Sequence, residues 1–357
     1  MQKNRTKIIF ITSGLGVGGA EKQLAMLAKG LIDREFDVLV ISMSKWKENT
    51  IHPDFDGLRL IQFNLKPRLG VLVSFLGFLN AIRIEKPHII QGWMYAGNIF
   101  ASLVGALFSS RVYHSIRASD MDSDRYGRQV WLNARLSLFA SAIVVNSYKG
   151  LSVHDLRGFP KDKMLVIPNG IDEKALFPNN KARRLMREAF GLEPEEKVFL
   201  YVSRLDPMKG HKRLIELAKL TPSIKYIFVG KGTETLDVPS NIICLGHRED
   251  LISLYNAADW LISWSNYGEG FPNVIAEAMA CGLPVFANDV GDSWFILGDT
   301  GFKSKANSSE QIAVDIEKLL QTPFSQRDKN RVAKRIRDNF SSSKMVSNYL
   351  DLYEKAS

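Results

Sequence analysis

Short apolar runs alternate with amphipathic stretches along the first half of the chain. Residues 20–34 carry Leu24, Leu27, Ala28 and Leu31 at helical spacing and predict a helix. Apolar runs that predict short buried strands lie at 7–12, 37–43, 87–93, 111–117, 142–147 and 164–170. Buried strands separated by helices are typical of an α/β fold in which crossover helices connect parallel strands.

The same pattern starts again in the second half. Strands are predicted at 197–204, 224–230, 241–246, 259–265 and 283–289, and helices at 211–220, 272–282 and 344–356. Pro272 suits the first turn of its helix and Gly282 suits its C-terminal cap. The repeat predicts two doubly wound, Rossmann-like domains joined near 170–180, with a binding cleft between them.

The composition is that of an ordinary globular protein, with 357 residues, 45% apolar and 24% charged. Two cysteines cannot build a disulfide framework, which fits a reducing cytoplasm. The N-terminal apolar stretch is too short for a signal peptide. The longest apolar runs, 69–82 and 99–108, fall short of the roughly 20 residues that span a bilayer. Any membrane contact is therefore expected to be peripheral.

The formal charge of +9 is concentrated in the first half. Residues 1–174 hold 23 Lys and Arg against 15 Asp and Glu, whereas residues 175–357 hold 24 against 23. A basic half suits an anionic lipid surface, a phosphorylated substrate or nucleic acid, and it is also compatible with a merely solvated face. No ladder of aromatic and basic residues and no zinc-ligand spacing supports nucleic acid.

The stretch GLGVGGAE (14–21) follows the first strand and matches the dinucleotide spacing through Gly14, Gly16 and Gly19. An NAD site needs an acidic residue at the end of the second strand, but that strand ends in ISMSKWK (41–47). An NADP site could use Lys45 or Lys47, with no other support. We interpret the turn as an amide-rich contact for a phosphate, with a tight turn without ligand as the alternative.

Two stretches of the second half carry candidate chemistry. In VSRLDPMKG (202–210), Arg204 and Lys209 lie at the end of a strand and suit a diphosphate, although a solvated basic loop is the alternative. In YGEGFPNVIAEAMACGLPV (267–285), Glu269 precedes a helix and Glu277 lies within it, where both could bind sugar hydroxyls. Both could equally be surface charges. VIPNGID (166–172) adds a turn, Asn169–Gly170, that suits a hinge.

This order of motifs strongly resembles the retaining glycosyltransferases of family 4, which have the GT-B fold. The resemblance rests on GGAE (18–21), IPNGID (167–172), SRLDPMKG (203–210) and EGFPNVIAEAMACGLPV (269–285), and it runs from about residue 7 to 353. VGDSWFILGDTG (290–301) is similar to bacterial surface-polysaccharide members. The resemblance implies an acceptor-binding domain over 1–172, a nucleotide-sugar domain over 173–340, and a helix over 341–357 that returns to the first domain.

The resemblance also implies roles for single residues. Arg204 and Lys209 would hold the diphosphate, Glu277 would bind the ribose, and Glu269 the transferred sugar. The implied catalytic residues are Glu269, His114, Arg204 and Lys209. Gly18 and Gly19 would close over the phosphate, and Gly270, Phe271, Pro272 and Asn273 would complete the donor site. His114 would lie near the anomeric carbon, with Arg117 and Asp120 beside it on the acceptor side. A buried core histidine is the alternative for His114.

The implied reaction moves a sugar from a nucleotide-diphosphate sugar, most simply a UDP-sugar, with retention and without a cofactor. No Asp-x-Asp motif lies at a strand end, so no metal is expected. The implied acceptor is a glycan or a lipid-linked saccharide of O-antigen, capsule or lipopolysaccharide synthesis, at the inner face of the plasma membrane. Lys66, Arg68 and Arg83 flank an apolar helix within 65–83 that could enter the interface or belong to the core. The alternatives are a sugar-nucleotide 2-epimerase of the same fold and a sugar-binding protein without activity.

Overall fold

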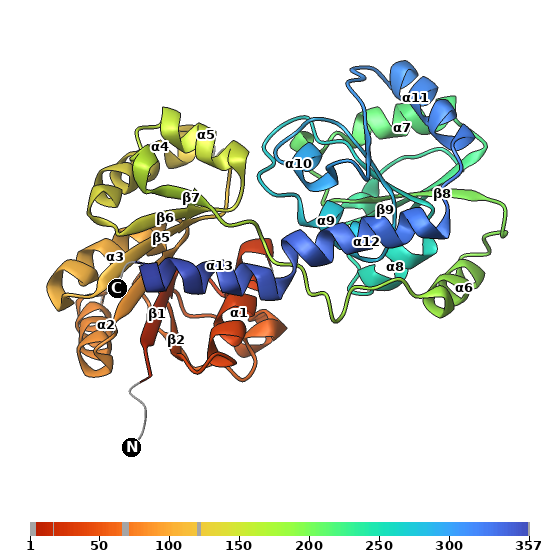
Figure 1. Cartoon of the computed structure of the whole chain (residues 1–357). Helices are drawn as coiled ribbons and strands as arrows, with labels where there is room; N and C mark the ends of the chain where they lie inside the picture. The colour runs from red at the N-terminus through yellow and green to blue at the C-terminus, as the bar shows by residue number, and fades with distance from the viewer. Residues whose placement is uncertain (1–4, 17, 66–70, 120–122, 356–357) are drawn as a thin grey trace. The chain divides into compact units, whose positions relative to one another are not determined.

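The computed structural model describes residues 5–16, 18–65, 71–119 and 123–355 (Figure 1). It forms two compact units, each with its own sheet and core. The first unit comprises Met1–Gly170 and Ser342–Ser357, and the second comprises Ile171–Ser341. The chain therefore crosses between the units twice, at Gly170–Ile171 and at Ser341–Ser342.

The first unit is built on a parallel sheet of seven strands in the order β3-β2-β1-β4-β5-β6-β7. Its strands are β1 (Lys7–Thr12), β2 (Asp37–Ser42), β3 (Leu60–Gln62), β4 (Ile89–Trp93), β5 (Arg111–Ile116), β6 (Ala142–Val145) and β7 (Met164–Val166). Its α-helices are α1 (Gly19–Ile32), α2 (Val71–Glu85), α3 (Met94–Phe108), α4 (Ser123–Leu136), α5 (Tyr148–Leu156) and α13 (Ser342–Lys355).

The second unit holds a parallel sheet of six strands in the order β10-β9-β8-β11-β12-β13. Its strands are β8 (Lys197–Val202), β9 (Ile224–Val229), β10 (Ile242–Cys244), β11 (Trp260–Ser263), β12 (Val285–Ala287) and β13 (Phe302–Lys303). Its α-helices are α6 (Asn180–Ala189), α7 (His211–Leu220), α8 (Leu251–Ala257), α9 (Asn273–Ala280), α10 (Ser293–Leu297), α11 (Ser309–Gln321) and α12 (Gln326–Phe340).

Both sheets are covered on both faces, which explains why their strands read as continuous apolar runs. Ile8 and Phe10 of β1 pack into one core cluster with α1 and α13, whereas Ile9 and Ile11 pack into another with α2 and α3. Successive side chains of a strand point to opposite faces, so a strand covered on both sides needs apolar residues at every position. This arrangement confirms the predicted pair of doubly wound α/β units.

Each sheet has a switch point, where the strand order reverses. It lies between β1 and β4 in the first sheet and between β8 and β11 in the second. In open parallel sheets, ligands bind at the carboxyl ends of the strands beside this point. The switch points therefore select four connections: the glycine turn after β1, the end of β4, the loop after β8, and the loop after β11.

Every predicted strand is present, but two short edge strands were missed. β3 and β13 have three and two residues, and neither forms an apolar run. The helix that follows β11 ends as predicted. Gly282 adopts a φ of 72°, its N–H donates to Met279 and the N–H of Leu283 donates to Ala278. These two bonds form a Schellman cap. Pro272, expected in the first turn, is instead the N-cap residue.

Candidate functional site

The second unit brings the predicted donor-site residues together at its switch point. Arg204 and Lys209 lie in the connection after β8, and Glu269 lies in the connection after β11. β8 and β11 are hydrogen-bonded neighbours, with Phe199 opposite Trp260. Two loops that are far apart in the sequence therefore meet at one edge of the sheet.

An ion pair joins these two loops. Lys209 Nζ binds Glu269 Oε1, and the hydroxyl of Ser265 donates to the same carboxylate oxygen at 2.6 Å. The side chains of Lys209 and Glu269 are 19% and 16% exposed, so both charges are largely withdrawn from water. The lysine is held from its backbone as well, because the hydroxyl of Tyr201 donates to its carbonyl. The pair thus presents a fixed cation and a fixed carboxylate side by side.

Arg204 is placed differently from Lys209. Its side chain is 65% exposed, and its guanidinium binds Asp206 Oδ2 at 3.0 Å. Burial alone would raise the pKa of Asp206, but hydrogen bonds from the Met208 N–H and from Arg204 hold that pKa below its usual range. Arg204 is therefore an accessible cation at the strand end, oriented by a carboxylate two residues away.

Glycines shape the loop that carries Glu269. Gly268 has a φ of 81°, a conformation that residues with a side chain rarely adopt. Gly291 approaches the same loop so closely that a Cβ there would lie 2.6 Å from the carbonyl oxygens of Glu269 and Gly270. The N–H of Asp292 donates to the Gly270 carbonyl at 2.8 Å. Residues 290–292 thus pack against the loop that carries Glu269 and support it.

Glu277 lies one turn inside α9 and is partly buried. It accepts a hydrogen bond from the buried hydroxyl of Tyr255 at 3.0 Å. Burial, followed by the nearby Glu277 carboxylate, raises the pKa of the Cys281 thiol to about 12. Tyr255 was missed in the sequence, because a tyrosine in an amphipathic helix carries no signal of such a contact.

The other predicted donor residues differ in what they can offer. The Phe271 side chain is buried and packs on Phe340 with ring centroids 5.6 Å apart, so only its backbone remains for a ligand. Asn273 is partly buried at the first position of α9, and Pro272 is buried. The arrangement therefore assigns Phe271 to the core rather than to the ligand surface.

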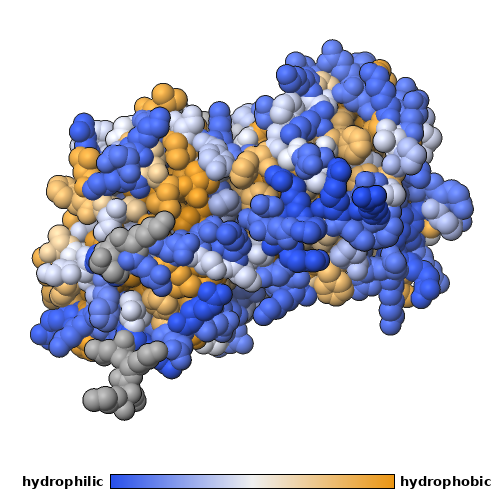
Figure 2. Space-filling view, viewed as in Figure 1, coloured by the Kyte–Doolittle hydropathy of each residue, from blue (hydrophilic) through white to orange (hydrophobic). Residues whose placement is uncertain are grey.

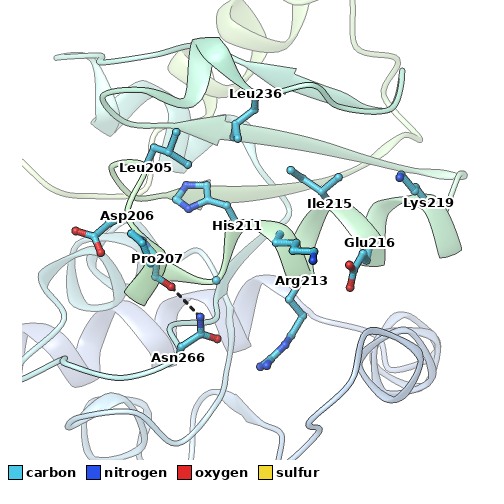
Figure 3. A pocket seen from close by; sticks show the side chains of 12 residues that line it. Leu205, Asp206, Pro207, His211, Arg213, Ile215, Glu216, Lys219, Leu236 and Asn266 are labelled. Atoms are coloured by element: carbon cyan, nitrogen blue, oxygen red, sulfur yellow. Dashed lines mark hydrogen bonds between the residues drawn. The ribbon is translucent and has the colours of Figure 1, made fainter.

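A pocket of about 800 Å³ lies beside these loops rather than at the ion pair (Figure 3). It follows α7 and is lined by Asp206, Pro207, His211, Ile215 and Leu236 among others, but not by Lys209, Glu269 or Glu277. His211 packs edge-on against Tyr201, with ring centroids 5.0 Å apart. Burial lowers the pKa of His211, which favours the neutral imidazole. This pocket borders the donor loops but does not contain the charged pair.

The glycine turn of the first unit ends at the N-terminus of α1. Gly18 is the N-cap residue and Gly19 the first helical residue, and within the described part of the chain no side chain caps the helix. The Trp46 ring covers the turn, since a Cβ on Gly16 would lie 2.8 Å from it. The Glu21 carboxylate folds back, so that a Cβ on Gly18 would lie 2.4 Å from its Oε2. No pattern in the sequence indicated either contact.

The structure does not place His114 at a ligand-binding edge. β5 runs to Ile116, so His114 lies in mid-strand, fully buried, with its Nε2 2.8 Å from the hydroxyl of Ser102. Burial lowers its pKa to about 3. His114 is therefore a core histidine, and the residue that follows the strand is Arg117.

The Arg117 side chain is held among aromatic and polar side chains of the first unit. Its guanidinium lies 4.2 Å from the centre of the Trp93 ring, and Nη1 donates to Asn169 Oδ1 at 3.2 Å. Nη2 donates to the hydroxyl of Tyr349 on α13. Asp120, the third expected acceptor residue, lies outside the described residues. Of the three, only Arg117 lies at the carboxyl edge of the sheet within the described part of the chain.

Among the described residues, no group of three or more His, Cys, Asp or Glu side chains could hold a metal ion. Within the same residues, no helix is long and apolar enough to span a bilayer.

Comparison with known proteins gives matches over both units. Residues 17–175 match the family Glycosyltransferase Family 4, and residues 182–338 match Glycosyl transferases group 1. The D-inositol 3-phosphate glycosyltransferase of Mycobacterium sp. (strain KMS) is 30% identical over 169 residues, which cover 43% of this chain and 38% of that protein. The N-acetyl-alpha-D-glucosaminyl L-malate synthase of Bacillus anthracis is 25% identical over 54% of each chain. The chain thus spans between about two fifths and about half of the length of these relatives.

The fold has counterparts among solved structures. Anabaena HepE, crystallised with UDP-glucose, superposes with a TM-score of 0.81 at 21% identity, over 98% of this chain and 100% of that one. Both units have a parallel sheet with a switch point, and each unit matches one glycosyltransferase family. The chain has the two-unit GT-B fold, with one region that matches Glycosyltransferase Family 4 over residues 17–175 and one that matches Glycosyl transferases group 1 over residues 182–338.

Proposed function

We propose that the protein transfers a sugar, with retention, from a nucleotide-diphosphate sugar to a saccharide acceptor. The observation that carries this proposal is the Lys209–Glu269 ion pair at the switch point of the second sheet. A diphosphate leaving group needs a cation and a transferred sugar needs hydrogen-bond acceptors, and the pair offers both at one place. HepE binds UDP-glucose, which supports a uridine nucleotide for this chain as well.

The proposed donor site divides the substrate among four side chains. Lys209 and Arg204 bind the diphosphate, Glu269 accepts hydrogen bonds from the sugar hydroxyls, and Glu277 binds the ribose. The Tyr201 hydroxyl already holds the Lys209 carbonyl, and Glu269 holds its ammonium group. Lys209 therefore loses little conformational freedom when a substrate binds. The amides of Gly18 and Gly19 at the start of α1 supply the phosphate contact of the first unit.

In the proposed reaction, an acceptor hydroxyl oxygen forms the bond to the anomeric carbon on the face that the diphosphate leaves. The bond between that carbon and the phosphate oxygen breaks, and the hydroxyl proton passes to a phosphate oxygen. Lys209 and Arg204 stabilise the negative charge that develops on the diphosphate. These two cations supply the charge that a divalent ion supplies in other transferases, so we propose a reaction without a metal.

We propose a saccharide on a lipid carrier, or a growing glycan, as the acceptor, at an anionic membrane surface on the cytoplasmic side. The first unit exposes large apolar side chains on three neighbouring elements, α2, α3 and the 3₁₀ turn η3 (Ser137–Phe139). Leu76, Leu107 and Phe139 are 57%, 65% and 80% exposed. Exposed apolar side chains on a half of the chain that carries most of the positive charge favour the interface of an anionic bilayer.

The sequence allowed the α2 region to be either a core helix or an interfacial one, and this helix has one buried side and one exposed side. Phe78 and Ile82 are fully buried, whereas Leu72 and Leu76 are exposed. Lys66 and Arg68 lie outside the described residues. Figure 2 shows more apolar surface on the first unit than on the second, whose visible face is mostly hydrophilic. Synthesis of O-antigen, capsule or lipopolysaccharide provides such an acceptor and such a membrane.

A test uses the purified full chain with a panel of nucleotide sugars. We expect release of nucleotide diphosphate from one donor, increased by a lipid-linked or oligosaccharide acceptor, with an α-linked product from an α-linked donor. A sugar-nucleotide 2-epimerase would instead convert the donor to its epimer without transferring sugar to an acceptor. Binding without turnover of any donor would indicate a sugar-binding protein and contradict the proposal.

A further inference from the structure

Two tyrosines of the C-terminal helix α13 hold this helix against the sheet of the first unit. Tyr349 and Tyr353 are buried, and the Tyr353 hydroxyl donates to Gln91 in the middle of β4. The Tyr349 hydroxyl accepts a hydrogen bond from Arg117, the first residue after β5. The last helix of the chain therefore contacts the carboxyl end of β5, beside the switch point of the first sheet.

Arg117 is an unusual cation, because none of the described residues gives it a carboxylate partner within ion-pair distance. Its positive charge lies on the face of Trp93, the last residue of β4, at 4.2 Å. Aromatic faces and neutral oxygens can hold a guanidinium, but they fix its position more than they neutralise its charge. Burial accordingly lowers the pKa of Arg117 from its usual high value.

The contacts of Arg117 form a closed ring that begins and ends on α1. Trp93, under the guanidinium, donates its indole N–H to the carbonyl of Ala20, in the first turn of α1, at 2.9 Å. On the other side, Arg117 binds Asn169, the neighbour of Gly170.

Gly170 connects this ring of contacts back to α1 through its hydrogen bonds with Gln23. The Gln23 amide donates to the Gly170 carbonyl at 2.8 Å and accepts from the Gly170 N–H at 2.7 Å. Gly170 is tightly enclosed at this place, since a Cβ there would lie 2.9 Å from the Cα of Ser342 at the start of α13. The glycine turn, both chain crossings and α13 are thus linked within one network of the first unit.

We propose that Arg117 is a positioning residue that couples the docking of α13 to the geometry of the glycine turn at residues 18–21. Arg117 touches no substrate in this role and acts through Trp93 on Ala20. The consequence for the reaction rests on the proposed function, in which the amides of this turn bind a phosphate of the donor. An undocked α13 releases Arg117, and the turn then loses the support that holds its amides in place.

The coupling can be measured without any substrate. Hydrogen–deuterium exchange of the full chain reports the opening of amides in residues 18–24. We expect Arg117→Gln to increase exchange there by about tenfold or more, and Tyr349→Phe, which removes a single hydroxyl, by a few-fold. Arg117→Lys keeps the charge but not the planar fork, so it should behave like Arg117→Gln.

Arg111→Gln is the matched control. Arg111 donates to the Tyr353 carbonyl at 2.9 Å, but it lies at the start of β5, at the opposite end of that strand from Arg117. This variant should loosen the end of α13 with less than a twofold change at residues 18–24. Equal exchange at 18–24 in Arg117→Gln and in the unmodified chain would overturn the coupling, as would full protection in Arg117→Lys.

Kinetics separate a positioning role from general destabilisation. A misplaced glycine turn should raise the donor KM by about tenfold while kcat changes less than threefold, whereas partial unfolding would lower kcat and leave KM unchanged. Unchanged donor KM together with lowered kcat would contradict the positioning role. If exchange responds as expected while Gly18→Ala retains full donor affinity, the coupling stands and the phosphate role of the turn fails instead.

Discussion

Lys209 and Glu269 form an ion pair across two loops that are 60 residues apart in the sequence. The pair depends on the neighbouring positions of β8 and β11, which no local pattern specifies. Its two charges are largely buried, so each is the main partner of the other until a substrate enters.

Removal of either cation should abolish most of the activity. We expect Lys209→Ala and Arg204→Ala each to lower kcat/KM by about two to four orders of magnitude, because each removes a charge that stabilises the leaving diphosphate. Arg204→Ala should leave the unfolding temperature nearly unchanged, since its side chain is 65% exposed. Lys212→Ala is the control and should retain activity, because Lys212 is an exposed residue of α7, which follows the loop that carries Arg204 and Lys209. Full activity in Arg204→Ala or Lys209→Ala would refute the diphosphate assignment.

The two glutamates should respond differently to neutralisation. Glu277→Gln should weaken the binding of free nucleotide diphosphate by about one to two orders of magnitude, because it loses charge-assisted hydrogen bonds to the ribose worth about 1.5–3 kcal/mol. Glu269→Gln should leave that affinity within a few-fold and abolish transfer. Calorimetric titration of both variants measures the difference. Equal weakening in both would mean that Glu269 contacts the nucleotide, and no weakening in either would remove the case for this site.

Gly18→Ala should reduce donor affinity while the fold stays intact. The added Cβ collides with the far end of the flexible Glu21 side chain, which can move aside, but it also fills the approach to the first amides of α1. We expect the donor KM to rise by about tenfold. Gly127→Ala on α4 is the control, because a Cβ there meets nothing within 4 Å. A donor KM equal to that of the control would show that the glycine turn does not contact the donor.

Glu21 should make stability and nucleotide binding depend on pH. Burial raises the pKa of Glu21, which means that folding favours the protonated form. Folding stability from this group is therefore greatest below the ordinary pKa of glutamate and falls as the pH rises through the raised value. The ionised carboxylate also repels an approaching phosphate. Glu21→Gln should flatten both dependences and tighten nucleotide binding at pH 8, and parallel pH profiles of the two proteins would contradict this.

The exposed apolar side chains should contribute to membrane binding. We expect the double variant with Leu107→Ser and Phe139→Ser to bind vesicles of anionic lipid about tenfold more weakly, because it removes two apolar anchors. Binding by the unmodified chain should weaken as salt rises. Leu220→Ser, at a 49% exposed leucine of the second unit, is the control in a vesicle flotation assay. Equal flotation of the double variant and the control would argue against this surface.

The sequence by itself determined the alternation of strands and helices, because a parallel sheet covered on both faces requires uninterrupted apolar runs. It also identified the loops that carry Arg204, Lys209 and Glu269, since glycine-rich and proline-containing stretches after strands have a distinct local chemistry. The Gly282 cap followed from the same local reasoning.

Tertiary structure decided which of these residues meet and which are buried. Strand order, which depends on long-range packing, placed the loops after β8 and β11 side by side and formed the Lys209–Glu269 pair. The end of β5 at Ile116 buried His114 and left Arg117 at the edge, a difference of three residues that an apolar run cannot resolve. Trp46, Trp93 and Tyr349 gather around the glycine turn and Arg117 from separate segments, so no spacing in the sequence could indicate their contacts.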